Sequence, residues 1–330
     1  MENVLLKAEN LRAYYKLEKV SVKAVDGLSF EIYEDEVVGV VGESGCGKTT
    51  LSNVIFMNMV KPLTLVGGKI FLKVNGSFEE ISALSRDEVK EKFWGKEMTI
   101  IPQSAMNALM PTIKMERYVQ HLAESHGLDA RELIDKTLQR FKEVGLETSW
   151  LKRYPFELSG GMRQRAVIAV STILNPSLLV ADEPTSALDV VNQKVFLKVL
   201  MSLKRRGIVK SIILITHDIA TVRQIADRMI IMYAGKIVEL SPIDELLEKP
   251  LHPYTEGLLN SVLTPEPEVK KRGIVTIPGA PPNLIDPPSG CRFHPRCPHM
   301  MDVCKEKEPP LVEIEPGRRV ACFLYAGERT

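Results

Sequence analysis

The sequence lacks any uninterrupted apolar run of the roughly 20 residues that a membrane-spanning helix needs. Its first ten residues place Glu2, Lys7 and Glu9 around a short apolar patch, which is typical of neither a signal peptide nor a membrane anchor. The chain is therefore expected to be cytosolic, and work at a membrane would require docking on another protein.

An excess of either charge is also lacking. The chain has 43 basic and 42 acidic residues and a formal net charge of +1. Nucleic-acid-binding proteins usually carry a basic excess or stripe, so this balance gives no reason to expect a nucleic acid as partner. The 45% of hydrophobic residues is ordinary for a globular protein, and 330 residues favour one large domain with an appendage, or two domains.

The order of apolar runs predicts an α/β fold. Residues 5–32 alternate apolar and polar side chains, which indicates an antiparallel sheet with one exposed face. Further along, short buried strands alternate with helices, as in a largely parallel sheet. The strands are expected at residues 37–41, 178–181 and 212–215, and the helices at 48–59 and 190–206.

Two further segments differ from the rest of the chain, one in the spacing of its apolar residues and one in its proline content. Residues 115–146 space their apolar residues as a helix does, with breaks at Gly127 and Gly145, so a helical subdomain is expected over about 104–160. Proline becomes dense from Ser241 onward, which excludes long helices and central strands. No internal repeat is present, and the predicted domains are residues 1–240 and a C-terminal extension, 241–330.

A glycine-rich segment between the strand 37–41 and the helix that follows predicts a phosphate-binding loop. Glycines allow backbone N–H groups to approach phosphate oxygens, and the helix N-terminus adds positive potential. Lys48 would reach the outer phosphates, Thr49 would bind Mg²⁺, and Thr50 is next in reach. The segment is Gly42-Glu43-Ser44-Gly45-Cys46-Gly47-Lys48-Thr49, where Cys46 occupies a variable position.

The apolar run 178–181 ends in two carboxylates, Asp182 and Glu183. In a site that binds nucleoside triphosphate, Asp182 is suited to hold Mg²⁺ through water. Glu183 is suited to orient the attacking water or accept its proton.

Shortly before this strand comes Leu158-Ser159-Gly160-Gly161-Met162-Arg163-Gln164, which resembles the signature of ABC (ATP-binding cassette) ATPases. Ser159 would cap a helix whose first amides, beside Gly160 and Gly161, form a second anion-binding device. Since the chain already has a phosphate loop, the resemblance implies that the signature serves ATP on a partner subunit. Two ATP molecules would then lie in a head-to-tail dimer.

The same resemblance implies roles for four more positions. Gln103 matches a glutamine that senses Mg²⁺ and the attacking water, and Ser186-Ala187-Leu188-Asp189 resembles a loop that crosses the dimer interface. His217 matches the histidine that contacts the γ-phosphate. Tyr15 corresponds best to the aromatic residue that stacks on adenine, with Tyr14 as the alternative.

The segment 104–111 is apolar but loop-like. In ABC transporters this region receives a helix of the transmembrane subunit, so a docking groove is expected, although these side chains could instead pack the core of the insertion.

The C-terminal extension is similar to that of the dipeptide/oligopeptide permease branch of ABC importers. The matching segments are residues 251–255, 277–282 and 290–297. The resemblance implies an importer ATPase at the cytoplasmic side of the cell membrane, with peptides or, alternatively, oligosaccharides as cargo. Its partners would be a second ATPase, paralogous or identical, two permease subunits and, indirectly, an external solute-binding protein.

Four of the five cysteines crowd this extension: Cys291, Cys297, Cys304 and Cys322. Clustered cysteines in a cytosolic protein indicate metal rather than disulfides, and a metal would supply folding free energy to a proline-rich segment. Zinc ribbons usually contain close C-x2-C pairs, which are absent here. The branch resemblance favours a 4Fe–4S cluster, with Zn²⁺ or no metal as alternatives.

Two other functions are disfavoured. DNA-repair ABC proteins carry long coiled coils between the two nucleotide motifs, and ABC translation factors carry two cassettes, whereas this chain has neither feature. A non-enzymatic regulator with a degenerate site is disfavoured because Lys48, Asp182, Glu183 and His217 are all present.

Overall fold

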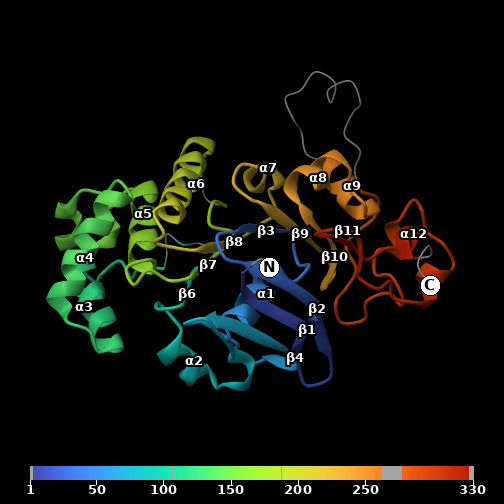
Figure 1. Ribbon diagram of the computed structural model, residues 1–330, viewed down its shortest axis with the longest axis horizontal. Coiled ribbons are helices and arrows are strands. Elements are labelled where there is room, and N and C mark those ends of the chain that lie inside the picture. Colours follow the sequence, from blue (N-terminus) through green and yellow to red (C-terminus); the bar gives the residue numbers. More distant parts are fainter. Residues whose placement is uncertain (1–2, 104, 106–107, 187, 262–276, 327–330) are drawn as a thin grey trace. The chain divides into compact units, whose positions relative to one another are not determined.

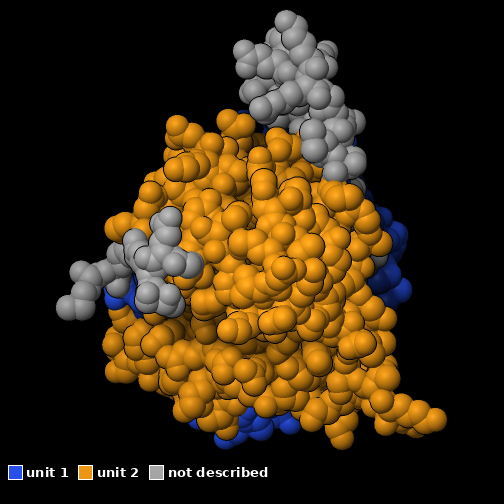
Figure 2. Space-filling view, turned by 90° about the vertical axis from the view of Figure 1, so that its right-hand side faces the viewer, with its two compact units in different colours: residues 1–5, 33–35, 84–213 blue, residues 6–32, 36–83, 214–330 orange. Residues whose placement is uncertain are grey.

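The computed structural model describes residues 3–103, 105, 108–186, 188–261 and 277–326, which group into two compact units (Figures 1 and 2). Unit 1 comprises residues 1–5, 33–35 and 84–213, and unit 2 comprises residues 6–32, 36–83 and 214–330. One of the boundaries between the units falls between Ile213 and Leu214, inside strand β8 (Ser211–Thr216).

Most of the first sheet lies in unit 2 and has the order β2-β1-β4-β5. The predicted alternation is confirmed: Leu28, Phe30 and Ile32 of β2 are buried, while Ser29 between them is exposed. Strands β1 and β4 pair antiparallel, as do β4 and β5. The bounds are β1 Val4–Lys16, β2 Ser21–Tyr33, β4 Leu63–Val74 and β5 Ser77–Glu80.

A second set of strands in unit 2 carries the phosphate-loop segment. Strand β3 (Val37–Val41) is buried throughout and pairs parallel with β9 (Arg228–Tyr233), as expected of a central α/β strand. Strand β9 pairs antiparallel with β10 (Lys236–Pro242). Helix α1 (Lys48–Ile55) follows β3 and is shorter than predicted, because Met57 adopts a left-handed φ of 51° that a helix cannot continue through.

The C-terminal extension contributes only short elements, as its proline content predicts. Its strand β12 (Arg318–Val320) pairs antiparallel with β10, and β11 (Val312–Glu315) pairs with β12. The remaining helices of unit 2 are α7 Ile219–Val222, α8 Ile243–Glu248, α9 Pro253–Ser261, α11 Val303–Glu306 and α12 Phe323–Ala326. Figure 1 shows α8 and α9 in orange and α12 in red.

Unit 1 combines a parallel strand pair with helices. Strand β6 (Met98–Ile101) pairs parallel with β7 (Leu178–Asp182). Helix α3 packs against α4, and α4 against α5, in the green part of Figure 1. The helices are α2 Arg86–Lys92, α3 Met115–His126, α4 Ala130–Glu143, α5 Gly160–Ser171 and α6 Val190–Arg205.

The predicted helical segment 115–146 is confirmed, and its break has a local cause. Helix α3 ends at Gly127, whose φ of 64° is left-handed, and Asp129 caps α4 by accepting from the N–H groups of Arg131 and Glu132. The limits of the two compact units differ from the predicted divisions at 104–160 and 240, which stay interpretations of the sequence.

No helix within the described part of the chain is both long enough and apolar enough to cross a membrane.

Candidate nucleotide site

The phosphate-loop segment has the backbone that its glycines predict. Gly45 and Gly47 take φ values of 78° and 109°. A Cβ atom on Gly47 would lie 2.0 Å from the carbonyl oxygen of Ala24, and one on Gly42 would lie 2.2 Å from that of Met232. Glycine is therefore required at both ends of the loop for its close approach to neighbouring backbone.

Lys48 begins helix α1 and is 5% exposed. Its Nζ donates to the carbonyl oxygens of Gly42, at 2.7 Å, and Glu43, at 3.0 Å. These bonds tie the ammonium group to the backbone at the start of the loop. Thr49 is exposed and Thr50 is buried.

The two candidate aromatic residues of strand β1 point to different partners. The hydroxyl of Tyr15 lies 3.1 Å from that of Thr50, in the helix that follows the phosphate loop. The hydroxyl of Tyr14 instead donates to Asp26 at 2.6 Å. The contact with Thr50 places the Tyr15 hydroxyl beside helix α1, and the stacking role of Tyr15 stays a prediction.

In unit 1, the acidic strand end and Gln103 share one edge. Because β6 and β7 are parallel and Ile101 is paired with Ala181, the ends of both strands meet there. Gln103 follows β6 and is exposed, while Asp182, at the end of β7, is 3% exposed. Glu183 takes a φ of 43°, which is uncommon for a residue with a side chain and is typical of functional sites.

The signature segment forms the predicted helix start. Ser159 is the N-cap of α5, and its hydroxyl accepts from the N–H of Met162 at 3.4 Å. Ser159 and Gly160 are exposed, whereas Gln164 is 3% exposed and donates to the carbonyl oxygen of Pro184. The helix is thus anchored behind the acidic strand end and presents its first residues to solvent.

The segment after the acidic strand caps another helix. Asp189 is the N-cap of α6 and accepts from the N–H of Asn192 at 2.9 Å, and Ser186 donates to the carbonyl oxygen of Glu183 at 3.1 Å. Ala187 lies outside the described residues.

His217 follows strand β8 and is exposed, and Asp218 caps the short helix α7. The predicted site residues are therefore divided between the units. Unit 2 holds Tyr15, the phosphate loop and His217, and unit 1 holds Gln103, the signature start, Asp182 and Glu183.

Comparison with protein families finds two matches in separate segments of the chain. Residues 25–186 match the family described as ABC transporter, and residues 238–304 match the family described as oligopeptide/dipeptide transporter, C-terminal region. The dipeptide transport ATP-binding protein DppD of Caldanaerobacter subterraneus subsp. tengcongensis is 36% identical, with 98% of each chain covered. The chain belongs to the ABC transporter family.

Further relatives of this ABC protein match over almost the whole chain. The oligopeptide transport ATP-binding protein AppD of Bacillus subtilis is 38% identical, covering 99% of this chain and 98% of its own. OppD of Escherichia coli, of the same description, is 37% identical over 97% and 93%. As a member of this family, the chain is an ATPase subunit.

A solved structure supports the fold assignment. The dimeric structure of a post-hydrolysis state of the ATP-binding cassette MJ0796, bound to ADP and Pi, is similar with a TM-score of 0.62 and 25% identity. It covers 72% of this chain and 99% of its own. The predicted α/β cassette fold is therefore confirmed.

The expected docking groove of this ABC subunit is only partly exposed. Ala105 and Leu109 are 3% and 5% exposed, so they pack the core of unit 1, whereas Met110 is 61% exposed. Ser104, Met106 and Asn107 lie outside the described residues. The alternative interpretation, in which these side chains pack the insertion, holds for Ala105 and Leu109.

The C-terminal extension contacts the phosphate loop directly, which sequence reasoning missed. Arg296 makes a bidentate ion pair with Glu43, and the N–H of Glu43 donates to the hydroxyl of Tyr254. One signal was available: a carboxylate within an anion-binding loop favours a nearby cation, although the sequence does not identify which one.

The four cysteines of the extension lie in unit 2 as free thiols. Burial, with the nearby Cys304 and Cys297 adding to it, raises the pKa of Cys291 to about 11. Burial likewise raises the pKa of Cys322 to about 11, and the other three thiols add to this. A direct contact joins two of them, because the N–H of Cys291 donates to the carbonyl oxygen of Cys304 at 2.8 Å.

These thiols do not converge on one ion. Among the residues that the structure describes, no group of three or more His, Cys, Asp or Glu side chains is arranged to hold a metal ion. The lone Cys46 is buried, and burial raises its pKa, so little reactive thiolate forms in the phosphate loop.

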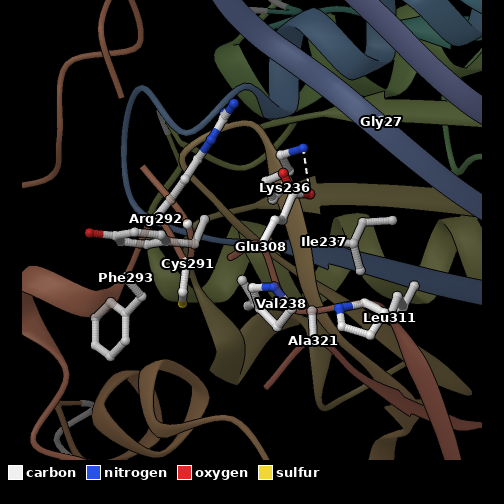
Figure 3. A pocket seen from close by; sticks show the side chains of 14 residues that line it. Gly27, Lys236, Ile237, Val238, Cys291, Arg292, Phe293, Glu308, Leu311 and Ala321 are labelled. Atoms are coloured by element: carbon white, nitrogen blue, oxygen red, sulfur yellow. Dashed lines mark ion pairs between the residues drawn. The ribbon is translucent and has the colours of Figure 1, made fainter. Parts of the chain in front are cut away.

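A small cavity of about 120 Å³ lies beside Cys291 (Figure 3). Its wall combines the β9–β10 hairpin with the extension, and an ion pair of 2.7 Å between Lys236 and Glu308 lies at its edge. Its volume is well below the roughly 300 Å³ of the smallest typical ligand pockets.

Proposed function

We propose that this chain hydrolyses ATP to drive the import of di- or oligopeptides. The carrying observation is that similarity to peptide-transport ATP-binding proteins runs through the C-terminal extension as well as the cassette. The relatives described above are named for peptide transport, so the oligosaccharide alternative is not favoured. A function as a non-transport ABC ATPase would not explain the presence of a C-terminal extension of the peptide-transporter type.

The chain would act at the cytoplasmic face of a membrane, bound to two permease subunits that receive peptides from an external binding protein. The exposed Met110 in the predicted docking segment supports a contact with a permease. Nucleic acid has no part in this function.

The phosphate loop would hold the triphosphate with Tyr15 beside the adenine. The loop residues are Gly42, Ser44, Gly45, Gly47, Lys48, Thr49 and Thr50. Thr49, Gln103 and Asp182 would hold Mg²⁺, whose charge offsets that of the phosphates during phosphoryl transfer. Glu183 would orient the attacking water and accept its proton, and His217 would contact the γ-phosphate.

A single chain would hold only half of each catalytic site. Ser159, Gly160 and Gly161 would bind the γ-phosphate of ATP seated on a second ATPase subunit, either a paralogue or an identical chain. The exposure of Ser159 and Gly160 at the start of α5 supports this arrangement, because a helix N-terminus that faces solvent can receive an anion from a partner.

The assigned roles predict a clear outcome for Glu183→Gln. Removing the carboxylate should lower ATP turnover by at least about 100-fold while ATP binding persists, as expected for loss of a group that acts in the transition state. Steady-state ATPase assays and equilibrium nucleotide binding, on the protein with its partner subunits, would test this. Wild-type turnover in this variant would overturn the mechanism.

We further propose that Cys291, Cys297, Cys304 and Cys322 hold a 4Fe–4S cluster. The support is the clustering of four cysteines in the extension without the close C-x2-C pairs that are typical of zinc ribbons. When bound, such a group would supply folding free energy to a region with few long elements.

The visible absorption spectrum of anaerobically purified protein, with iron and sulfide analysis, separates the alternatives. A broad band that disappears in Cys297→Ser supports the cluster. Stoichiometric zinc without iron, or no bound metal, would refute it.

A further inference from the structure

The phosphate loop contains an acidic residue where negative charge is costly. Glu43 follows Gly42 and lies within the segment that would receive a triphosphate. Its side chain is 24% exposed, so solvent screens it only partly. An uncompensated carboxylate here would repel the phosphates and weaken nucleotide binding.

Arg296 of the extension compensates that charge. Its two terminal nitrogens donate to the two carboxylate oxygens of Glu43, at 2.8 and 3.0 Å, and its Nε donates to the carbonyl oxygen of Pro278 at 2.7 Å. The Arg296 side chain is 6% exposed. A bidentate pair fixes orientation as well as charge, so the carboxylate is held against the extension.

The backbone of Glu43 is held by the same region. Its N–H donates to the hydroxyl of Tyr254 at 2.9 Å, and its carbonyl oxygen accepts from Lys48. Side chain, N–H and carbonyl of this residue are therefore all engaged, two of them by the extension.

A buried aromatic cluster supports both contacts. The ring of Tyr233 lies 4.6 Å from that of Tyr254 and 5.1 Å from that of Phe293. Arg296 lies 5.7 Å from the Tyr233 ring and donates to its hydroxyl at 3.3 Å. The three rings are at most 2% exposed, so this support belongs to the buried core of unit 2.

We propose that Arg296 is a positioning residue of the nucleotide site, which neutralises Glu43 and holds it against the C-terminal extension. This rests on the proposed function, in which the loop binds ATP. The extension then belongs to the ATP site, although Arg296 and Glu43 are 253 positions apart in sequence.

The test is equilibrium nucleotide binding to the full chain carrying Arg296→Gln. The dissociation constant of ATP should rise about tenfold, and those of ADP and AMP progressively less, because repulsion by Glu43 scales with phosphate charge. Adding Glu43→Gln should restore ATP binding to within about threefold of wild type. Arg296→Lys keeps the positive charge but loses the bidentate geometry. Its dissociation constant for ATP should therefore lie between those of wild type and Arg296→Gln.

The control is Arg318→Gln. Arg318 is equally buried in the extension and pairs with Glu315 at 2.9 Å, without an observed bond to the phosphate loop. This variant should bind ATP as wild type does. Thermal unfolding of each variant without nucleotide reports its folding.

Three results would overturn the proposal: equal weakening for ATP and AMP, no rescue by Glu43→Gln, or the same loss in Arg318→Gln. If Arg296→Gln does not fold, Arg296→Lys with and without Glu43→Gln decides by the same criteria. Lys48→Ala separates this inference from the function: undiminished ATP binding there would refute the loop as the ATP site, whatever Arg296 does.

Discussion

The phosphate loop and the signature segment are both anion-binding helix starts, but they are built differently. The ends of the loop are anchored in its own unit: Gly42, Gly47 and Lys48 are buried, and the C-terminal extension holds Glu43, while Ser44, Gly45 and Thr49 are exposed. At the signature, Ser159 and Gly160 are exposed, and the helix behind them is anchored through Gln164. A loop whose ends are anchored within its own unit suits a ligand bound by the single chain, and an exposed helix start suits a ligand delivered by a partner.

The largest expected effect separates the two devices. Lys48→Ala should weaken ATP binding to the single chain by about 100-fold or more, whereas Gly160→Asp should leave it within about threefold. Gly160→Asp should nevertheless lower ATPase turnover by about 100-fold, because its carboxylate would face the partner's γ-phosphate. Binding and turnover measured on both variants check this. Loss of ATP binding to the single chain in Gly160→Asp would contradict the separate roles of the phosphate loop and the signature segment.

A smaller effect is expected at the start of α6, beside the loop that would cross the dimer interface. Val190 and Val191 are 66% and 71% exposed, which is unusual for two adjacent apolar residues at a helix start. Replacing both by serine should weaken the ATP-induced dimer at least about tenfold, since fully burying one valine side chain contributes about 1.5–3 kcal/mol.

Sedimentation of the Glu183→Gln protein with ATP, where hydrolysis does not dissociate the dimer, measures this effect. Val60→Ser provides the matched control, because Val60 is 62% exposed in unit 2. An unchanged dimerisation constant in the double serine variant would argue against an interface at Val190 and Val191.

The smallest effect concerns the support behind the phosphate loop. Burial lowers the pKa of His252 from 6.5 to about 3, and its Nδ1 accepts from the N–H of Tyr254 at 3.0 Å. Between these pH values the unfolded chain binds a proton that the folded chain does not. Stability therefore falls as pH drops through this range, by at most about 1.4 kcal/mol per pH unit.

His252→Asn keeps an acceptor near that position but cannot take up the proton. Melting temperatures measured from pH 7 to pH 5 should fall less steeply in the variant than in wild type. Parallel profiles would exclude His252 as the source of acid sensitivity.

The features that could be predicted from the sequence share one property: each is defined by residues that are consecutive in the chain. The phosphate loop, the buried strand ending at Asp182 and the helix capped by Ser159 depend on local backbone geometry, so their residue types reveal them. The segment 104–111 was harder, because burial of Ala105 and Leu109 depends on distant packing.

The pairing of Glu43 with Arg296 could not be predicted, because it joins parts of the chain that only the folded unit brings together. The cysteine spacing indicated a shared site but did not identify its occupant. The assembly partners and the cargo depend on other proteins. The sequence of one chain indicates them only through its resemblance to a known family.

The pairing of β10 with β12 has a practical consequence for fragments of this protein. A cassette cut after residue 240 would expose the edge of β10, which is a template for strand pairing between molecules. It would also remove the N–H groups of Leu251 and His252 that bond the fully buried carboxylate of Glu239. Such a fragment should aggregate, whereas one that retains β12 should not.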